Sequence, residues 1–255
     1  MTTFPDLKTV IITGATSPRG IGRATADLLA SSGWNVGIID LDEAECKNLA
    51  NELSSKYGIQ AYGAAADVAD EVMVRAAIDQ VENNLPQIVA LANIAGVSSA
   101  VGYLELTSQE WHRVLNVNLH GVHYVTHRVA ETMVRHGVGR IVSISSVSAQ
   151  RGGGTYSKTP YSVAKAGLIG LTRSLARELG PHNITVNAIA PGPIDTDIMG
   201  GTLSEERKVA LVEDLVVTRL GTTADIASAI RFLLAEEAGY ISGQTLNVDG
   251  GLYMH

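Results

Sequence analysis

Short apolar runs alternate with longer segments of helical periodicity along nearly the whole chain. An apolar run of about four to eight residues predicts a buried strand. Strands and helices in alternation form right-handed βαβ units, with parallel strands and helices on both sheet faces. We therefore predict an α/β fold: a doubly wound parallel sheet of about seven strands in a three-layer α/β/α arrangement. The predicted strands are Lys8–Thr13, Asn35–Asp40, Ile59–Ala65, Ile88–Ala92, Arg140–Ser145, Asn183–Ala190 and Thr245–Val248. The predicted helices are Ile21–Ser32, Glu43–Tyr57, Asp70–Asn84, 107–136, Tyr161–Leu179 and Asp225–Ala235.

The composition fits one large domain. The chain has 255 residues, of which 45% are apolar, and no linker, repeat or low-complexity tract divides it. A chain of this size can bury one sizeable core. We predict a single domain over residues 1–255.

Charge and cysteine content exclude several classes of protein. A net charge of −7, without a run of basic residues, argues against nucleic acid as a partner. The N-terminus lacks a signal-peptide pattern, and no apolar run approaches the ~20 residues that span a membrane. A single cysteine, Cys46, excludes an internal disulfide. We expect a soluble, cytoplasmic protein that does not bind membranes.

A glycine-rich turn joins the first predicted strand to the first predicted helix. The turn reads TGATSPRGIG over residues 13–22 and contains Gly14, Gly20 and Gly22. Without side chains there, backbone amides can approach a pyrophosphate, and the helix N-terminus adds partial positive charge. The turn predicts a Rossmann-like dinucleotide site.

The second predicted strand ends in an acidic residue. Asp40 lies twenty positions after Gly20, where a carboxylate can accept hydrogen bonds from the adenosine ribose and repel a 2′-phosphate. Asp40 therefore favours NAD over NADP. Arg19 argues in the opposite direction, because a basic residue in the turn can meet a 2′-phosphate. Capping of the next helix is an alternative role for Asp40, although Asp42 would serve as well.

Further polar residues follow later strands. Asp67, Asn93 and Gly96 fall at carboxyl ends, where doubly wound sheets bind their ligands. The rigid turn PGPIDT follows another strand at 191–196, and the less regular region 197–220 is typical of a substrate lid.

The sequence YSVAK at 161–165 places a phenol and an ammonium on one helix face. A cation near Tyr161 would lower its pKa, so that the phenol could accept a proton from an alcohol or donate one to a ketone. Ser146 follows the preceding strand, where its hydroxyl could bond a substrate oxygen.

The helix 107–136 starts at a predicted capping box, Thr107-x-x-Glu110, and carries Asn118 beside its apolar stripe. It also carries His120, His123 and His127 on one face. We predict no metal there, because no carboxylate or cysteine joins these histidines at ligand spacing.

Together these motifs resemble the single-domain short-chain dehydrogenases/reductases, and the resemblance runs from Lys8 to Gly251. The motifs that carry it are TG…GIG, Asp40, DV at 67–68, NIAG at 93–96, Asn118, Ser146, YSVAK, PGPIDT and DGG at 249–251.

The resemblance implies a role for each matching residue. Tyr161 would be the acid/base, Lys165 would lower its pKa and hold the nicotinamide ribose, and Ser146 would orient the substrate. Asn118 would hold a water in a proton relay. The implied cofactor contacts are Gly14, Gly20, Ile21 and Gly22 at the pyrophosphate, Asp67 and Val68 at the adenine, Asn93 and Gly96 along the cofactor, and Ile194 and Thr196 at the carboxamide.

The chain departs from the family pattern at three places. The glycine turn, with Ala15–Arg19 between its first two glycines, is two residues longer than usual. Ile94 replaces the second asparagine of the usual NNAG. The segment between Ser146 and Tyr161 is also longer by two residues, so Ser148 would match by count alone. Ser146 is preferred because it directly follows the strand.

The implied function is hydride transfer between NAD(H) and a secondary alcohol or ketone, with a polyol or sugar as the expected small-molecule substrate. An NADPH-dependent 3-oxoacyl-(acyl-carrier-protein) reductase is the alternative. An enoyl reductase is disfavoured, because that related group separates its tyrosine and lysine further. A catalytically silent NAD-binding scaffold is disfavoured because all four active-site residues are present. The resemblance also implies a homotetramer that packs through helices 107–136 and 161–179.

Overall fold

The structure is a computed structural model that describes residues 3–154, 156–199, 201 and 204–254. Its centre is a seven-stranded sheet in the order β3-β2-β1-β4-β5-β6-β7, and every pairing is parallel. The strands are β1 (Thr9–Thr13), β2 (Asn35–Asp40), β3 (Ala61–Ala65), β4 (Ile88–Asn93), β5 (Gly139–Ile144), β6 (Ile184–Pro191) and β7 (Thr245–Val248). The predicted fold class and all seven strands are confirmed. The crossover between β3 and β4 places the ends of β1 and β4 at the switch point of the sheet, where such folds bind ligands.

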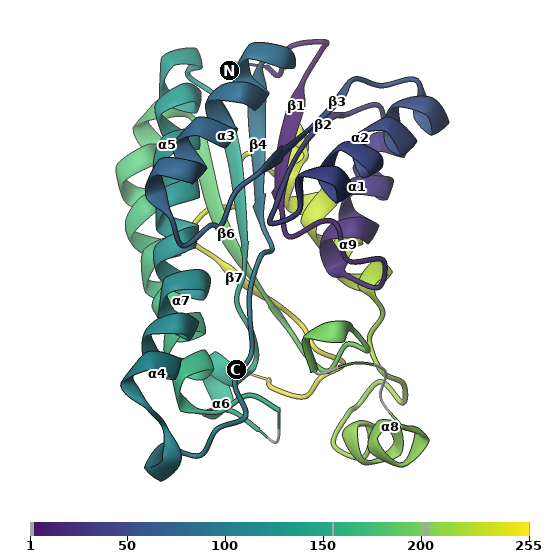
Figure 1. Ribbon diagram of the computed structural model, residues 1–255, viewed down its shortest axis with the longest axis vertical. Coiled ribbons are helices and arrows are strands. Elements are labelled where there is room, and N and C mark those ends of the chain that lie inside the picture. Colours follow the sequence, from purple (N-terminus) through teal and green to yellow (C-terminus); the bar gives the residue numbers. More distant parts are fainter. Residues whose placement is uncertain (1–2, 155, 200, 202–203, 255) are drawn as a thin grey trace.

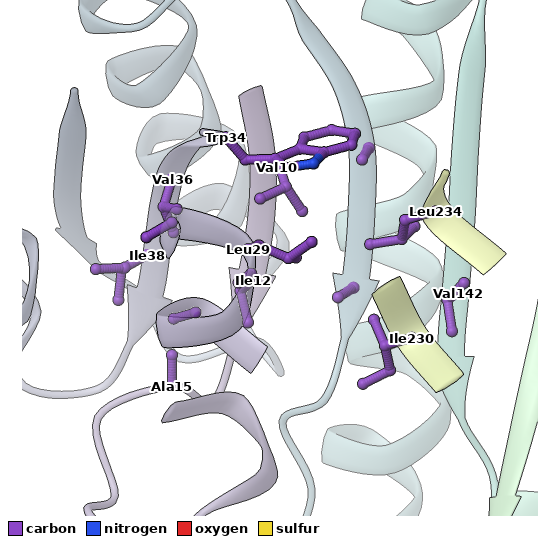
Figure 2. Close-up of a cluster of buried hydrophobic side chains, with 14 of the residues drawn as sticks. Val10, Ile12, Ala15, Leu29, Trp34, Val36, Ile38, Val142, Ile230 and Leu234 are labelled. Carbon is purple, nitrogen blue, oxygen red and sulfur yellow. The ribbon is translucent and has the colours of Figure 1, made fainter. Parts of the chain in front are cut away.

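Helices cover both faces of the sheet (Figure 1). One face carries α1 (Ile21–Ser31), α2 (Glu43–Tyr57) and α9 (Thr223–Leu234), and the other carries α3 (Glu71–Asn84), α5 (Gly121–His136) and α7 (Thr159–Leu179). Figure 2 shows the first of the two apolar layers, in which Leu29 of α1 and Ile230 of α9 pack with Val10 and Ile12 of β1. None of the helices described is long and apolar enough to cross a membrane.

Local sequence signals explain where several helices begin and end. Asp42 accepts a hydrogen bond from the amide of Glu45 at the start of α2, and Asp70 accepts from Val72 and Met73 at the start of α3. Gly58 ends α2 in the left-handed conformation that glycine favours. These caps satisfy backbone groups that the helices leave unpaired.

The long helix predicted over 107–136 is not continuous. It consists of α4 (Ser108–Leu115), a π-helical turn, η2 (Asn116–His120), and α5. The predicted capping box is half formed: Thr107 accepts from the amide of Glu110, whereas the Glu110 carboxylate bonds the guanidinium of Arg113. The π turn was not predicted, because one extra residue in a turn leaves the apolar periodicity on either side nearly unchanged.

The remaining short elements lie mostly in the connecting loops. They are η1 (Tyr103–Glu105), α6 (Ser148–Arg151), η3 (Gly180–His182), η4 (Asp197–Met199), α8 (Glu205–Val212) and η5 (Glu236–Ala238). At the carboxyl end of the sheet, α4 and α6 lie on one side and α8 on the other (Figure 1). The predicted lid, 197–220, contains η4 and α8, while residues 200, 202 and 203 of it lie outside the described part of the chain.

Candidate active site

Four side chains predicted to act in catalysis lie at the carboxyl edge of the sheet. Ser146 follows β5, Tyr161 and Lys165 project from the first turns of α7, and Asn118 lies in the π turn. The Ser146 hydroxyl lies close enough to the Tyr161 phenol to lower its pKa. The Nζ of Lys165 lies 5.6 Å from the centre of the Tyr161 ring. The structure thus brings the phenol, the serine hydroxyl and the ammonium together.

Lys165 is held by the sheet. Its Nζ donates a hydrogen bond of 2.7 Å to the carbonyl oxygen of Ile144, and the residue is only 2% exposed. Ser145 donates from its hydroxyl to the carbonyl oxygen of Lys165 at 2.8 Å, so backbone and side chain are both tied to the end of β5. Burial lowers the pKa of Lys165 to about 7, because a buried ammonium loses its hydration.

The predicted lowering of the Tyr161 pKa by Lys165 is not found among the groups of the chain itself. Burial raises the pKa of Tyr161 to about 12, and the nearby Ser146 hydroxyl opposes that rise in part. Lys165 does not offset that rise, since burial also disfavours its ammonium form. A phenol in this environment is a proton donor at neutral pH, and its use as a base requires further positive charge in the site.

Asn118 is fully buried and its side chain is fixed by backbone groups. Its Nδ2 donates to the carbonyl oxygens of Val97 and Val114, both at 2.8 Å, and its Oδ1 accepts from the amide of Val97 at 3.3 Å. A Cβ on Gly96 would lie 2.7 Å from Oδ1 of Asn118 and 3.5 Å from Nζ of Lys165. The glycine therefore keeps open a space that both polar groups face.

The geometry favours Ser146 over Ser148 as the active-site serine. Ser146 lies close enough to Tyr161 to lower its pKa, and it accepts from the amide of Ser148 at 3.1 Å. The hydroxyl of Ser148 instead pairs with that of Ser157 at 2.8 Å. The additional residues of this segment are accommodated by α6 and the glycine loop after it.

The glycine turn fits a pyrophosphate. Gly14 has φ +71°, and a Cβ there would lie 2.7 Å from the Cα of Ala95. A Cβ on Gly22 would lie 2.2 Å from the carbonyl oxygen of Gly14. Helix α1, which begins at Ile21 after Gly20, has no side-chain cap and no acidic residue in its first turn. Its first amides and the positive end of its dipole are thus suited to an anion.

Asp40 lies beside this turn at the end of β2. Its Oδ2 accepts from the amide and the hydroxyl of Thr16 at 2.9 and 2.8 Å, and its Oδ1 accepts from the amide of Leu41 at 2.9 Å. Asp42, not Asp40, caps α2. A carboxylate has about four acceptor positions, so Asp40 retains one position for a ribose hydroxyl. The contact with Thr16 was missed, because nothing in the spacing of the turn specifies which residue faces β2.

The sequence-predicted cofactor residues of β3 and β4 differ in their surroundings. Asp67 is exposed and accepts from the amide of Ala69, and Val68 is buried. Asn93 is also buried, and its side chain donates to the hydroxyls of Thr126 and Ser143. It thus joins β4 to α5 and β5, and its place along the cofactor stays a prediction.

The turn after β6 lies against the glycine turn. Ile194 and Thr196 are nearly buried, and Ile194 forms a bridge with Gly221. Arg19 forms ion pairs with Asp195 at 2.6 Å and with Asp197 at 3.2 Å. Neither aspartate was predicted to contact the glycine turn, and their only signal was the acidic spacing in PGPIDTD.

The histidines of the middle helix form local contacts. His120 lies 3.1 Å from Oδ1 of Asn116, the rings of His123 and His127 are 5.8 Å apart, and His127 lies 3.6 Å from Glu131. Across the described ranges, no group of three or more histidine, cysteine or acidic side chains is arranged to hold a metal ion.

Comparison with known proteins relates nearly the whole chain to one family. A family model described as "Enoyl-(Acyl carrier protein) reductase" matches residues 14–253. A short-chain type dehydrogenase/reductase of Sinorhizobium fredii is 40% identical over 97% of this chain and 98% of its own. The 3-oxoacyl-[acyl-carrier-protein] reductase of Aquifex aeolicus is 40% identical over 96% of this chain and 97% of its own.

Solved structures agree with the sequence comparison. A 3-oxoacyl-[acyl-carrier protein] reductase from Brucella melitensis aligns with a TM-score of 0.89 and 34% identity, over 99% of this chain and 93% of that one. A second from the same organism, with bound NAD, aligns with a TM-score of 0.88 and 35% identity over the same shares. This chain accordingly belongs to the short-chain dehydrogenase/reductase family, and it is an oxidoreductase that acts on CH–OH groups with a nicotinamide cofactor.

Proposed function

We propose that this enzyme interconverts a secondary alcohol and a ketone with NAD(H), and that Tyr161 moves the hydroxyl proton. The observation that carries this proposal is the placement of the Tyr161 phenol close to Ser146, which lowers its pKa, with Nζ of Lys165 5.6 Å from the ring centre. One substrate oxygen between the phenol and the serine hydroxyl would receive a hydrogen bond from each. Such placement is the geometric requirement for general acid–base catalysis.

The residues divide the chemistry between them. The bound nicotinamide supplies the hydride acceptor or donor, and its oxidised form adds positive charge. In the reductive direction Tyr161 donates its proton to the oxygen that gains negative charge, and Ser146 orients that oxygen. In the oxidative direction the phenolate takes the proton from the alcohol. Lys165, whose pKa of about 7 permits exchange in either direction, then passes the proton toward Asn118.

NAD as the cofactor is supported by Asp40. Its carboxylate lies at the end of β2 next to the glycine turn, where it can bond a ribose hydroxyl and repel a 2′-phosphate. We would titrate wild type and Asp40→Ala with NADH and NADPH and follow nicotinamide fluorescence. Tighter binding of NADH, with a smaller difference in Asp40→Ala, supports the assignment; tighter binding of NADPH by the wild type contradicts it.

The substrate we propose is a small polar secondary alcohol of the polyol or sugar type. The second candidate is reduction of a 3-oxoacyl thioester, which the names of the Aquifex and Brucella relatives favour. An acidic carrier protein would need cations near the site. Arg113, Arg151 and Lys208 are each paired with a carboxylate, whereas the exposed Arg207 contacts the Tyr156 ring. The choice of a free small molecule therefore rests on Asp40, which favours NAD, whereas reductive biosynthesis usually draws on NADPH.

A substrate panel separates the candidates. Wild type would be assayed by NADH absorbance with polyols, sugars and hydroxy acids, and with acetoacetyl thioesters of coenzyme A and of carrier protein. Activity confined to the thioesters would favour the 3-oxoacyl candidate. Reduction of a crotonyl thioester would indicate an enoyl reductase, and failure with the whole panel would favour a silent scaffold.

We also propose a homotetramer that packs through α4, α5 and α7. Exposed residues on these helices include Val163 and His123. Sedimentation velocity that yields a monomer would contradict the proposal.

A further inference from the structure

We infer that Asp195 and Asp197 strengthen the preference for NAD by holding Arg19 away from a 2′-phosphate. This inference rests on the proposed NAD(H) function and deepens it. Arg19 is the only cation in the glycine turn, residues 13–22, and a basic residue there is the natural partner of a 2′-phosphate.

Each terminal nitrogen of Arg19 has its own carboxylate. Nη2 lies 2.6 Å from Oδ1 of Asp195, and Nη1 lies 3.2 Å from Oδ1 of Asp197. The hydroxyl of Ser17 donates to the other oxygen of Asp197 at 3.2 Å. The guanidinium is therefore bound from two sides by the turn that follows β6.

The longer glycine turn explains why Arg19 reaches these carboxylates. The amide of Gly20 donates to the carbonyl oxygen of Ser17 at 2.9 Å, which closes a tight turn with Pro18 and Arg19 at its centre. Proline fixes its own φ and favours the second position of such a turn. The additional length thus forms a rigid corner that presents Arg19 to Asp195 and Asp197.

The balance of charge disfavours a phosphate at this corner. Arg19 carries one positive charge and the two aspartates carry two negative charges, which leaves a net negative charge. Lys208 of α8 lies 3.7 Å from Asp195, but it also pairs with Glu205 at 2.8 Å. Asp40 adds a carboxylate on the other side of the glycine turn through its bonds to Thr16. A dianionic 2′-phosphate would have to displace carboxylates from Arg19 and accept repulsion from both sides.

The test measures binding rather than turnover. Dissociation constants for NADH and NADPH would be measured by fluorescence titration for wild type and for Asp195→Asn/Asp197→Asn, each also in the Asp40→Ala background. In Asp195→Asn/Asp197→Asn, Arg19 is released from its carboxylates. The dissociation constant for NADPH divided by that for NADH should then fall by about tenfold. Addition of Arg19→Met should restore the ratio.

A matched control removes the same charge elsewhere. Glu178→Gln/Glu237→Gln neutralises two exposed acidic residues away from the glycine turn. The inference is overturned if the control changes the ratio of the two dissociation constants as much as Asp195→Asn/Asp197→Asn does. It is also overturned if the ratio stays changed when Arg19→Met is added to that double variant. If the double variant does not fold, each single variant should give part of the change, and no change in either overturns the inference.

The outcomes also separate this inference from the proposed function. A wild type that binds NADPH more tightly contradicts the role of Asp40. The effect of Asp195 and Asp197 is read from the change in the ratio, whichever cofactor the wild type prefers.

Discussion

The ammonium of Lys165 bonds the last carbonyl of β5, Ile144, at 2.7 Å while it lies 5.6 Å from the ring centre of Tyr161. The lysine is thus anchored to the sheet, with its ammonium held beside the phenol ring. The Tyr161 hydroxyl lies close to Ser146, which lowers its pKa. Both charged forms are disfavoured by burial, since the Tyr161 pKa is raised and the Lys165 pKa is lowered.

Tyr161→Phe removes the proposed acid/base and little else. We expect kcat to fall by about 10²-fold to 10⁴-fold, the usual contribution of general acid–base catalysis. Cofactor affinity and the thermal midpoint should change little, because the ring remains. Steady-state kinetics with fluorescence titration of NADH would measure this split. Tyr62→Phe, which removes a hydroxyl at a distance from the site, is the matched control, and equal losses of activity in the two variants would contradict the assignment.

Activity should depend on pH with opposite signs in the two directions. Oxidation needs a deprotonated phenol, whose pKa burial raises to about 12, so kcat/KM for the alcohol should rise with pH through the alkaline range. Reduction needs the protonated phenol and should fall where oxidation rises. A pH–rate profile in each direction checks this, and parallel profiles would argue against Tyr161 as the titrating group.

Lys165 should also impose a pH dependence on stability. Its pKa falls from 10.5 unfolded to about 7 folded, so between these values the unfolded chain binds the extra proton. Stability therefore rises with pH across this window, because the cost of a buried charge is present below about 7 and is relieved above it. The Lys165→Met variant buries no charge at this position at any pH. Its stability relative to wild type should be highest near pH 6 and decline toward pH 10 in urea unfolding. The exposed Lys47→Met serves as control, and a difference independent of pH would contradict the prediction.

The fold could be predicted because its signals are local and repeated. Each of the seven strands is a short apolar run, and helices such as Glu43–Tyr57 were bounded correctly by a capping aspartate and a following glycine. The boundaries that shifted are at fraying ends. Lys8, for example, precedes β1, and Ile59 precedes β3. At these positions hydrogen bonding to a neighbouring strand decides the boundary, and a single strand's sequence does not contain that information.

The site was predictable in its parts but not in its contacts. The positions of Tyr161, Lys165 and Ser146 follow from chain order and strand ends. The pKa of Tyr161 was predicted in the wrong direction for the chain itself, since the cation was considered without the burial of both groups. The bond from Asn93 to Thr126 depends on the side of β4 to which alternation assigns the side chain, and the prediction used only its position at the strand end. Arg19 and Asp195 are in contact although 176 residues separate them in the sequence. Local sequence patterns do not predict such a contact.

An ion-pair cluster between α3 and α5 should contribute to stability. The Arg128 side chain is 9% exposed, and its guanidinium pairs with Asp79 and Glu82 and donates to the hydroxyl of Thr132. Arg128→Met should destabilise the protein by about 1–3 kcal/mol, because Asp79 loses its ion-pair partner and Glu82 keeps only Arg135 and Thr132. The carboxylates are partly solvated, which limits the loss.

Arg75→Met tests whether burial is the cause of that loss. Arg75 pairs with Glu131 on the same two helices, but its side chain is 43% exposed. The expected loss is about 0–1 kcal/mol. Chemical denaturation of both variants measures the difference, and equal losses would show that burial of Arg128 adds nothing.

Two glycine-to-alanine substitutions should change stability in opposite directions. A methyl group on Gly96 would lie 2.7 Å from Oδ1 of Asn118, so Gly96→Ala must displace that amide and intrude on the space that Lys165 faces. We expect a destabilisation of about 1–3 kcal/mol, together with weaker NADH binding and lower kcat. Gly170 is exposed on α7 with no neighbouring atom within 4 Å of an added Cβ, so Gly170→Ala should stabilise by about 0.5–1 kcal/mol and leave NADH binding unchanged. Urea unfolding and fluorescence titration measure both properties. Normal NADH affinity and kcat in Gly96→Ala would contradict the view that this glycine keeps the cofactor side of the site open.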